Sequence, residues 1–356
     1  MTAACPPKIQ TAIQRGLVFP AHPLALDANR KLDERRQRAL SRYYLAAGAG
    51  GLALGVHTTQ FAIREPAVGL FRPVLEIAKE EFDRADEGRR DPYVRIAGIC
   101  GNTEQAMGEA RLIRELGYHV GLLSLGALQS KSEDELLNHC REIAAVVPLF
   151  GFYLQPAAGG RPLSYAFWRR FSEIENVIAI KIAPFNRYQT VDVVRAVAEA
   201  GRDDIALYTG NDDNIVADLL TPFRFKVNGA LRERRIVGGL LGHWAFWTRA
   251  AVDTLLECQG LVRTKRVFPA NTLQLNIETT DANAAIFDAA NLFRGCIPGI
   301  HEVLRRQGLL EGTWCLDSNE TLSPGQIEQI DRVYAAYPHL NDDKFVEEHR
   351  DEWLTP

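Results

Sequence analysis

One lysine stands inside an otherwise apolar run of the sequence. Residues 177–183 read VIAIKIA, and Lys181 is the only charged residue among them. Unalternating runs rich in β-branched residues are typical of parallel strands that are buried on both faces. Burial disfavours the charged form of an amine, so it lowers the pKa of a lysine from its usual value of about 10.4. A neutral amine can attack a carbonyl carbon to form a Schiff base, so the run predicts nucleophilic catalysis by Lys181.

A structural role is the alternative interpretation of Lys181. A lysine at the end of a strand can lay its stem on apolar surface and hold its ammonium group in water. Lysine is rarely fully buried, and this favours the structural interpretation for the residue taken alone. The choice therefore depends on what the rest of the fold places near Lys181.

The elements that must position Lys181 alternate along the chain as short apolar runs and amphipathic stretches, which predict strands and helices. Strands are expected at 16–22, 51–55, 94–100, 119–125, 149–154, 177–183, 205–209 and 236–241. Helices are expected between and after them, at 30–47, 70–83, 103–116, 132–146, 164–174, 190–200, 214–220 and 243–257. Eight strand–helix units with right-handed crossovers predict an α/β fold, the (β/α)8 TIM barrel. An open, doubly wound sheet is the competing fold, but no GxGxxG or Walker loop follows the first strand.

The chain divides into three predicted parts. We expect an N-terminal extension over residues 1–15, the barrel over 16–260 and a helical C-terminal extension over 261–356. Helices of the extension are expected at 281–294, 299–306 and 324–336. The charged tail from Asn341 onward is expected to be peripheral or partly ordered.

Composition excludes several classes of function. A net charge of −4 without a basic stripe argues against nucleic-acid binding, and Arg232, Arg234 and Arg235 are expected to be solvated in a loop. No apolar run reaches the roughly 18 residues of a membrane span, and residues 1–15 lack the apolar core of an export signal. The six cysteines have no metal-ligand spacing and are expected to be reduced thiols. We therefore expect a cytoplasmic protein without a membrane partner.

Polar residues gather where the predicted strands end, which is where barrels carry their chemistry. His57, Thr58 and Thr59 follow the second strand and offer donors for a carboxylate. Tyr153 lies near the end of the fifth strand, and Arg161 lies in the glycine-rich loop behind it. These side chains are the candidates for the surroundings of Lys181.

These residues and motifs together resemble the pyruvate-dependent class I aldolase family of dihydrodipicolinate synthase and N-acetylneuraminate lyase. The family has a YNVP-like motif on the fifth strand and an IKEATGN-like motif on the sixth, where this chain has YLQP at 153–156 and IKIAPFN at 180–186. Further similar segments, in family order, are PAHP at 20–23, LYTGND at 207–212 and IPG at 297–299. The resemblance covers roughly residues 16–310.

The resemblance implies a role for two of these residues. Lys181 matches the lysine that forms a Schiff base with a 2-oxo acid, and Tyr153 matches the tyrosine that relays protons. The roles agree with the chemistry, because an iminium withdraws electrons from the adjacent carbon and a nearby phenol can move the proton thus released. An ordinary core aromatic with a satisfied hydroxyl is the structural alternative for Tyr153.

The loop after the second strand departs from the family pattern. The family has GTTGE or GSTGE where this chain has GVHTTQ at 55–60. Either Thr58 and Thr59 are shifted by two residues, or Val56 and His57 replace the hydroxyl pair, and both alignments stay open. We expect His57, Thr58 and Thr59 to contact the substrate.

Other departures concern the fourth, fifth and eighth strands. Residues 124–129 lack the tyrosine that reaches a neighbouring subunit's site in dihydrodipicolinate synthase, so we expect weak or absent synthase activity. Arg161 lies further from Tyr153 than the arginine of the synthase, so a substrate contact and a surface position are both open. Gly239, in the eighth strand, is included among the expected substrate-binding residues.

The predicted function is that of a class I lyase, aldolase or dehydratase acting on pyruvate or on a 2-oxo acid derived from a sugar acid. The resemblance implies a homo-dimer or homo-tetramer, and no cofactor is expected. A catalytically silent 2-oxo-acid or sugar-acid binding protein of the same fold is one alternative. A metal-dependent class II aldolase is another, but His22, His57, His119 and His243 form no ligand motif, so no metal is expected.

Overall fold

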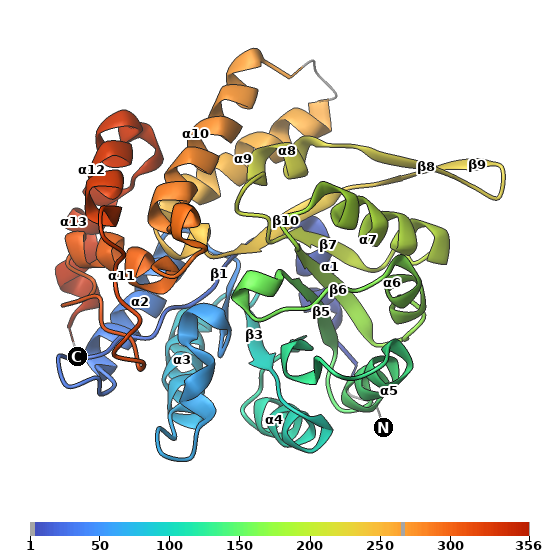
Figure 1. Ribbon diagram of the computed structural model, residues 1–356, viewed down its shortest axis with the longest axis horizontal. Helices are drawn as coiled ribbons and strands as arrows, with labels where there is room; N and C mark the ends of the chain where they lie inside the picture. Colours follow the sequence, from blue (N-terminus) through green and yellow to red (C-terminus); the bar gives the residue numbers. More distant parts are fainter. Residues whose placement is uncertain (1–3, 265–267, 356) are drawn as a thin grey trace.

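The computed structural model describes residues 4–264 and 268–355. In these residues eight parallel strands form one sheet, in the order β1-β10-β7-β6-β5-β4-β3-β2. The strands are β1 (Val18–Pro20), β2 (Gly51–Leu54), β3 (Val94–Ile99), β4 (Val120–Leu123), β5 (Leu149–Leu154), β6 (Val177–Ala183), β7 (Ala206–Thr209) and β10 (Ile236–Leu241). A parallel bridge between Ala21 and Ala53 joins the two ends of this order, so the sheet curls into a nearly closed barrel (Figure 1). The predicted (β/α)8 barrel is confirmed.

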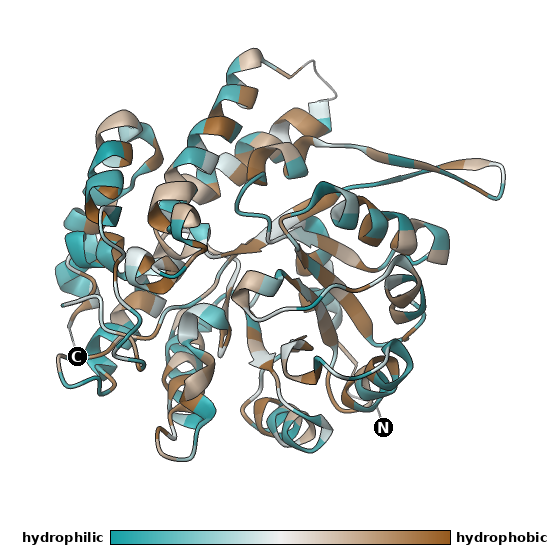
Figure 2. Cartoon of the chain, viewed as in Figure 1, coloured by the Kyte–Doolittle hydropathy of each residue, from teal (hydrophilic) through white to brown (hydrophobic). Residues whose placement is uncertain are grey.

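The strands are buried on both faces. Every residue of β6 is buried, as its unalternating apolar run predicts. Side chains that point inward, such as Phe150, Phe152 and Tyr208, fill the barrel, whereas those that point outward pack against the helices. Figure 2 shows the central strands as mostly hydrophobic. The side chain of each strand residue therefore lies on one of two separate faces, and this decides which residues can meet.

The helices surround the barrel (Figure 1). They are α2 (Glu34–Ala46), α3 (Phe71–Asp86), α4 (Thr103–Glu115), α5 (Glu133–Ala144), α6 (Tyr165–Phe171), α7 (Arg187–Ala200), α8 (Ile215–Leu220) and α9 (Thr248–Thr264). Five of them begin after a side chain that accepts a hydrogen bond from a backbone N–H of the first turn, and these N-cap residues are Asp33, Asn102, Ser132, Ser164 and Asn186. Within the described residues no helix has both the length and the apolar composition needed to cross a membrane.

The last barrel helix begins later than predicted. The sequence predicted a helix over 243–257, but a single 3-10 turn, η5 (His243–Ala245), comes first and α9 starts at Thr248. Trp247 between them has a positive φ of 51°. A left-handed residue interrupts a right-handed helix, so the predicted element is divided into two.

The arginine-rich segment before β10 is a hairpin and not the predicted loop. Strands β8 (Phe223–Val227) and β9 (Ala230–Arg234) pair in antiparallel fashion and project away from the barrel (Figure 1). Asn228 and Gly229 join them with φ angles of 50° and 81°, the Asn-Gly turn that favours tight hairpins. Arg234 is not solvated as predicted, because its side chain is 11% exposed and pairs with Asp203 at 3.0 Å.

The C-terminal part is helical, as predicted, but two of its boundaries were wrong. Its helices are α10 (Ala270–Ile286), α11 (Cys296–Arg306), α12 (Gln326–Ala336) and α13 (Asp343–Trp353). The helix predicted over 281–294 ends at Ile286, because Asp288 and Leu292 have left-handed φ angles of 58° and 57°. Its early start escaped prediction because polar residues such as Asn276 lie on its buried face.

The tail after Asn341 is ordered, and the expectation of a peripheral segment was wrong. Helix α13 packs against α2. The Tyr43 hydroxyl of α2 donates a hydrogen bond of 2.7 Å to Asp342, and the carbonyl of Leu354 accepts one of 2.7 Å from Arg35. Buried polar contacts of this kind fix the tail onto the barrel.

Residues 7–15 form a helix that the sequence left unassigned. In α1 (Pro7–Arg15), Ile9 and Ile13 are buried against side chains of the barrel interior. The hydroxyl of Tyr208 donates a hydrogen bond of 2.7 Å to the carbonyl of Ile13. Helix α1 therefore covers the end of the barrel where the strands begin. The division of the chain at residues 15 and 260 stays a prediction.

Candidate active site

Lys181 lies in the barrel interior near the carboxyl end of β6. It is 8% exposed, and its register neighbours are Phe152 in β5 and Tyr208 in β7. The Nζ atom lies 4.3 Å from the centroid of the Phe152 ring. A Cβ atom at Gly210 would lie 2.7 Å from Cε of Lys181, so only glycine leaves room for the lysine stem. The amine faces a cavity of about 80 Å³, which is several times the space that one water molecule needs.

Asp212 shares this cavity and interacts electrostatically with Lys181. Burial lowers the pKa of Lys181, and the negative charge of Asp212 partly opposes this. Burial raises the pKa of Asp212, although the backbone N–H of His243 donates a hydrogen bond of 2.9 Å to Oδ1 of that carboxyl. Both groups thus move toward their neutral forms, a neutral amine and a protonated carboxyl.

His57 and Thr58 line the same cavity, and their contact with a substrate stays a prediction. Burial, with a smaller contribution from Lys181, lowers the pKa of His57 to about 4, so its imidazole is neutral at pH 7. The hydroxyl of Thr58 donates a hydrogen bond of 2.7 Å to the carbonyl of Ala21. Thr59 does not line the cavity, because its hydroxyl donates at 2.7 Å to the carbonyl of His22. The Thr59 hydroxyl therefore holds the loop, and the structure does not bring this predicted substrate-binding residue to the cavity.

Tyr153 lies on the opposite face of the barrel wall from Lys181. Successive strand residues point to opposite faces, and Phe152 is the β5 residue that points inward beside Lys181. The Tyr153 hydroxyl donates to the carbonyl of Leu163 and accepts from its N–H, both at 3.1 Å. The Tyr153 ring lies 5.3 Å from that of Trp168. The predicted pairing of Tyr153 with Lys181 is therefore wrong, and the residue is a core aromatic with a satisfied hydroxyl.

Arg161 and Gly239 do not line the cavity either, so the structure does not bring these two predicted substrate-binding residues to Lys181. The guanidinium of Arg161 donates to the carbonyls of Leu128 and Lys131 at 2.6 and 2.9 Å, which ties together two loops. A Cβ atom at Gly239 would lie 2.6 Å from the ring of Trp244, a residue of the outer core. Both residues thus serve the packing of the barrel.

Sequence reasoning missed several residues that line the cavity. Asp212 could have been found, because it ends the LYTGND segment directly after β7. Gln155 follows β5 in the same way. Aromatic and aliphatic side chains complete the wall, namely Phe152, Leu154, Phe185, Phe287, Phe293 and Ile300. Three of them come from the C-terminal part, whose contact with the barrel no local pattern reveals.

A more voluminous groove, of about 830 Å³, lies between α9, α10 and the segment before α13. It is a surface feature in which several charges are paired, as in the 2.8 Å contact of His339 with Glu278. Within residues 4–264 and 268–355 no three His, Cys, Asp or Glu side chains gather in the way that a metal ion requires. The cavity at Lys181 combines burial with several titratable groups of shifted pKa, among them Lys181, Asp212 and His57, and this makes it the candidate active site.

Solved structures share the barrel. One is a monomeric dihydrodipicolinate synthase variant, with a TM-score of 0.71 and 16% identity over 92% of this chain and 98% of that one. Another is N-acetylneuraminate lyase from Fusobacterium nucleatum complexed with pyruvate, with a TM-score of 0.69 and 16% identity over 92% and 99% of the two chains. At this identity the likeness shows the fold.

Curated relatives match part of the sequence. The 4-hydroxy-tetrahydrodipicolinate synthase of Moorella thermoacetica is 28% identical over 204 residues, which are 56% of this chain and 65% of that enzyme. The enzyme of the same name from Bifidobacterium longum is 24% identical over 201 residues, 55% and 60% of the two chains. The aligned part thus spans less than two thirds of these relatives. The family model described as the Dihydrodipicolinate synthetase family matches residues 16–222, more than half of the chain, and the protein therefore belongs to that family.

Proposed function

We propose that this protein is a class I lyase or aldolase in which Lys181 forms a Schiff base with a 2-oxo acid such as pyruvate. The observation that carries the proposal is the buried amine of Lys181, whose pKa is lowered by burial, at the wall of a small cavity. Relatives support the choice of acid, because a dihydrodipicolinate synthase from Acinetobacter baumannii and the lyase from Fusobacterium nucleatum were solved with pyruvate.

The first step is attack of the neutral Nζ atom of Lys181 on the keto carbon of the acid. A C–N bond forms, the keto oxygen takes up two protons and leaves as water, and an iminium remains. The iminium withdraws electrons, so the adjacent carbon can lose a proton and become a nucleophilic enamine. The enamine can form a carbon–carbon bond with an aldehyde, and the reverse sequence cleaves one.

Asp212 is the group that we propose for proton transfer, in place of Tyr153. Its carboxyl lines the cavity beside Lys181, and its raised pKa lets it hold a proton near neutral pH. It can thus protonate the departing oxygen and take the proton back in a later step. The neutral imidazole of His57 is a second acceptor in the same cavity.

The carboxylate of the acid is proposed to bind at η1 (His57–Thr59), the turn after β2. The first N–H groups of a helical turn have no partner within that turn. Those of His57 and Thr58 are therefore the donors that we expect to hold the carboxylate, next to the cavity that both residues line. This arrangement keeps the keto carbon within reach of Lys181.

Borohydride trapping tests the proposal. The protein is incubated with pyruvate and reduced, so that hydride adds to the iminium carbon and leaves a stable secondary amine on the peptide containing Lys181. Lys181→Ala is expected to lose this adduct, whereas Lys79→Ala, a surface control, keeps it. Absence of an adduct with pyruvate and with other short 2-oxo acids contradicts the proposal, and binding without an adduct identifies a silent binding protein.

Three further properties are proposals of the same kind. Synthase activity with aspartate semialdehyde is expected to be weak, because residues 124–129 offer no tyrosine. A homo-dimer or homo-tetramer is expected, although one neighbour is a monomeric variant, so sedimentation velocity is the deciding measurement. A cytoplasmic location remains a proposal that fractionation of cells can test.

A further inference from the structure

Apart from the residues proposed to bind the 2-oxo acid, the walls of the Lys181 cavity are mostly apolar. Lys181 and Asp212 serve the keto carbon and its proton transfers, and His57 and Thr58 serve the carboxylate. Of the other described side chains that line the cavity, only Gln155 carries a strong hydrogen-bonding group. The remainder is dominated by four phenylalanine rings with Leu154 and Ile300.

Two of these rings form an edge-to-face pair. Phe185 lies in the loop that follows β6, and Phe293 comes from the segment between α10 and α11. Their ring centroids lie 5.7 Å apart with an interplanar angle of 77°. This geometry is favourable between aromatic rings, and a further aromatic group can extend it.

The backbone holds both rings in a costly conformation. Phe185 has a φ of 51° and Phe293 a φ of 64°. Left-handed angles are uncommon for bulky residues, and they persist where the surrounding structure fixes them, often at functional sites. Asp288 anchors the C-terminal segment, since its carboxylate accepts hydrogen bonds from the N–H of Gly295 at 3.0 Å and from Ser323 at 2.5 Å. The strain thus lies in the residues that present the rings.

A polyhydroxylated substrate does not suit such a wall. Each hydroxyl that is buried without a partner weakens binding by about tenfold or more. An apolar group gains affinity from the same surface in proportion to the area that it buries. The wall therefore selects against sugar chains and favours a flat apolar group.

We propose that the second substrate is an aldehyde that carries an aromatic group. The inference rests on the Schiff-base function proposed above. The enamine carbon of the bound acid attacks the aldehyde carbon, a carbon–carbon bond forms, and the aldehyde oxygen takes the proton held by Asp212. Water then hydrolyses the iminium and releases a 4-aryl-4-hydroxy-2-oxo acid together with the free amine. The reverse reaction cleaves that product into the 2-oxo acid and the aromatic aldehyde.

The test compares two aldehydes with the full-length protein and pyruvate. Product formation is measured by liquid chromatography and mass spectrometry with benzaldehyde and with glyceraldehyde. We expect kcat/KM to be at least about tenfold higher for benzaldehyde, as the unpaired hydroxyls of glyceraldehyde require. Equal or greater turnover of glyceraldehyde, or no turnover of benzaldehyde, overturns the inference.

Two variants test whether the aromatic wall of the cavity causes the preference for benzaldehyde. Phe293→Asn places a polar side chain in the cavity and suits a left-handed backbone, so it is expected to fold and to lower the benzaldehyde preference at least fivefold. Leu231→Asn, on the distant hairpin, is the matched control and keeps the preference. A Phe293→Asn variant that keeps the full preference contradicts the inference.

Borohydride trapping with pyruvate distinguishes a failure of the aromatic-aldehyde inference from a failure of the proposed Schiff-base function. If borohydride attaches pyruvate to Lys181 but benzaldehyde is not preferred, the aromatic substrate is wrong and the Schiff-base function stands. If no adduct forms, the proposed function fails and the inference fails with it.

Discussion

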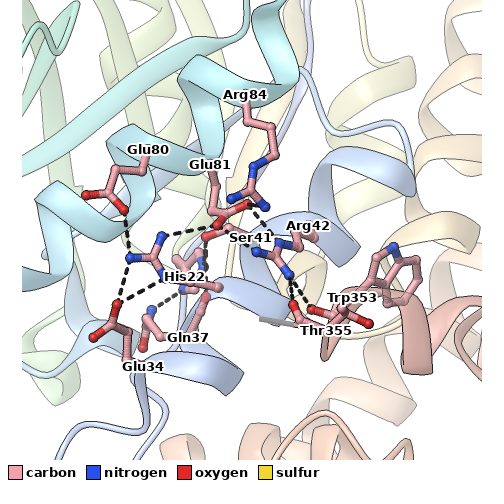
Figure 3. Close-up of polar contacts among 11 residues, drawn as sticks. His22, Glu34, Gln37, Ser41, Arg42, Glu80, Glu81, Arg84, Trp353 and Thr355 are labelled. Carbon is pink, nitrogen blue, oxygen red and sulfur yellow. Dashed lines mark hydrogen bonds and ion pairs between the residues drawn. The ribbon is translucent and has the colours of Figure 1, made fainter.

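Two of the clusters of buried charge among the described residues differ in how completely their charges are paired. One consists of Lys181 and Asp212 at the cavity. The other surrounds Glu81, which lies in α3 against α2 with a side chain that is 1% exposed. Figure 3 shows the carboxylate of Glu81 among the side chains of Arg42 and Arg84, with the C-terminal residues next to them.

The Glu81 cluster is paired on every side. Its carboxylate accepts hydrogen bonds from Arg42 at 2.8 and 3.1 Å and from Arg38 at 3.2 Å, and Arg84 lies 3.4 Å away. Arg42 also donates to the carbonyls of Trp353, at 2.9 Å, and Thr355. Burial alone would raise the pKa of Glu81, but the arginines hold it below its usual value.

The cavity cluster has the opposite electrostatics. Lys181 and Asp212 attract one another, yet burial outweighs this attraction and moves both pKa values toward neutrality. Complete pairing fixes a charge and makes the group structural, whereas incomplete pairing next to a cavity leaves a group able to exchange a proton. The comparison therefore supports the chemistry proposed for the Lys181 cluster and a structural role for the Glu81 cluster.

The largest effect is expected at Lys181. Lys181→Met removes the proposed nucleophile, so turnover should fall by about 10⁴-fold or more. The melting temperature should stay the same or rise, because an amine that is costly to bury is replaced by an apolar side chain. Activity assays and calorimetry measure the two effects, and a marked loss of stability would break the comparison.

A somewhat smaller effect on turnover is expected at Asp212. Asp212→Asn should lower turnover by about 10²–10⁴-fold and still allow the borohydride adduct with pyruvate. Loss of the negative charge lowers the pKa of Lys181 further, so adduct formation should persist to lower pH than in the wild type. Asp213→Asn, which alters the adjacent carboxyl, is the control. An unchanged pH profile in Asp212→Asn would refute the electrostatic pairing.

At Glu81 the expected effect is on stability. Glu81→Gln should cost about 3 kcal/mol in the free energy of unfolding, because it removes the buried charge that pairs with the half-buried Arg38 and Arg42, while turnover of the folded protein is kept. The folded pKa of Glu81 lies below the unfolded value of about 4.3, so its contribution is complete above that pH and lost as the pH falls through the folded pKa.

Denaturant unfolding as a function of pH measures the contribution of Glu81. The exposed neighbour Glu80 is the control, and Glu80→Gln should change stability by less than about 1 kcal/mol. Similar losses in both variants would show that burial of Glu81 does not matter.

The smallest effect is expected at Tyr153. Tyr153→Phe should change turnover by no more than about threefold and cost about 1 kcal/mol of stability, because the hydroxyl only bonds the backbone of Leu163. Steady-state kinetics and thermal unfolding measure both quantities. A loss of 10² or more in turnover would place Tyr153 in the chemistry after all.

The same feature of the sequence, its short apolar runs, predicted both the barrel and the buried position of Lys181. A single charge in a run of buried residues stands out, and repeated runs define parallel strands. The same runs do not alternate, so they do not tell which face a side chain takes, and the orientation of Tyr153 was lost with that information. The position of Asp212 after β7 could be recognised in the sequence. Its interaction with Lys181, however, depends on how the fold brings β6 and β7 together.

The aromatic wall could not be predicted from local patterns. Phe287 and Phe293 lie more than 100 residues after Lys181 in the chain and reach the cavity only through the packing of the C-terminal helices. Arg161 is a similar case, because backbone carbonyls of a different loop are its partners. Contacts of this kind depend on tertiary structure.

Helix α1, at the start of the chain, has its partners far along the sequence. The carbonyl of Ile13 accepts its hydrogen bond from Tyr208, 195 residues later, and the next strand, β1, pairs with β10. During synthesis this segment leaves the ribosome before the residues that it contacts, so it cannot complete these contacts until most of the barrel has followed. We therefore expect α1 to cover the end of the barrel where the strands begin only late in folding. Until then Ile9 and Ile13 are exposed to chaperones.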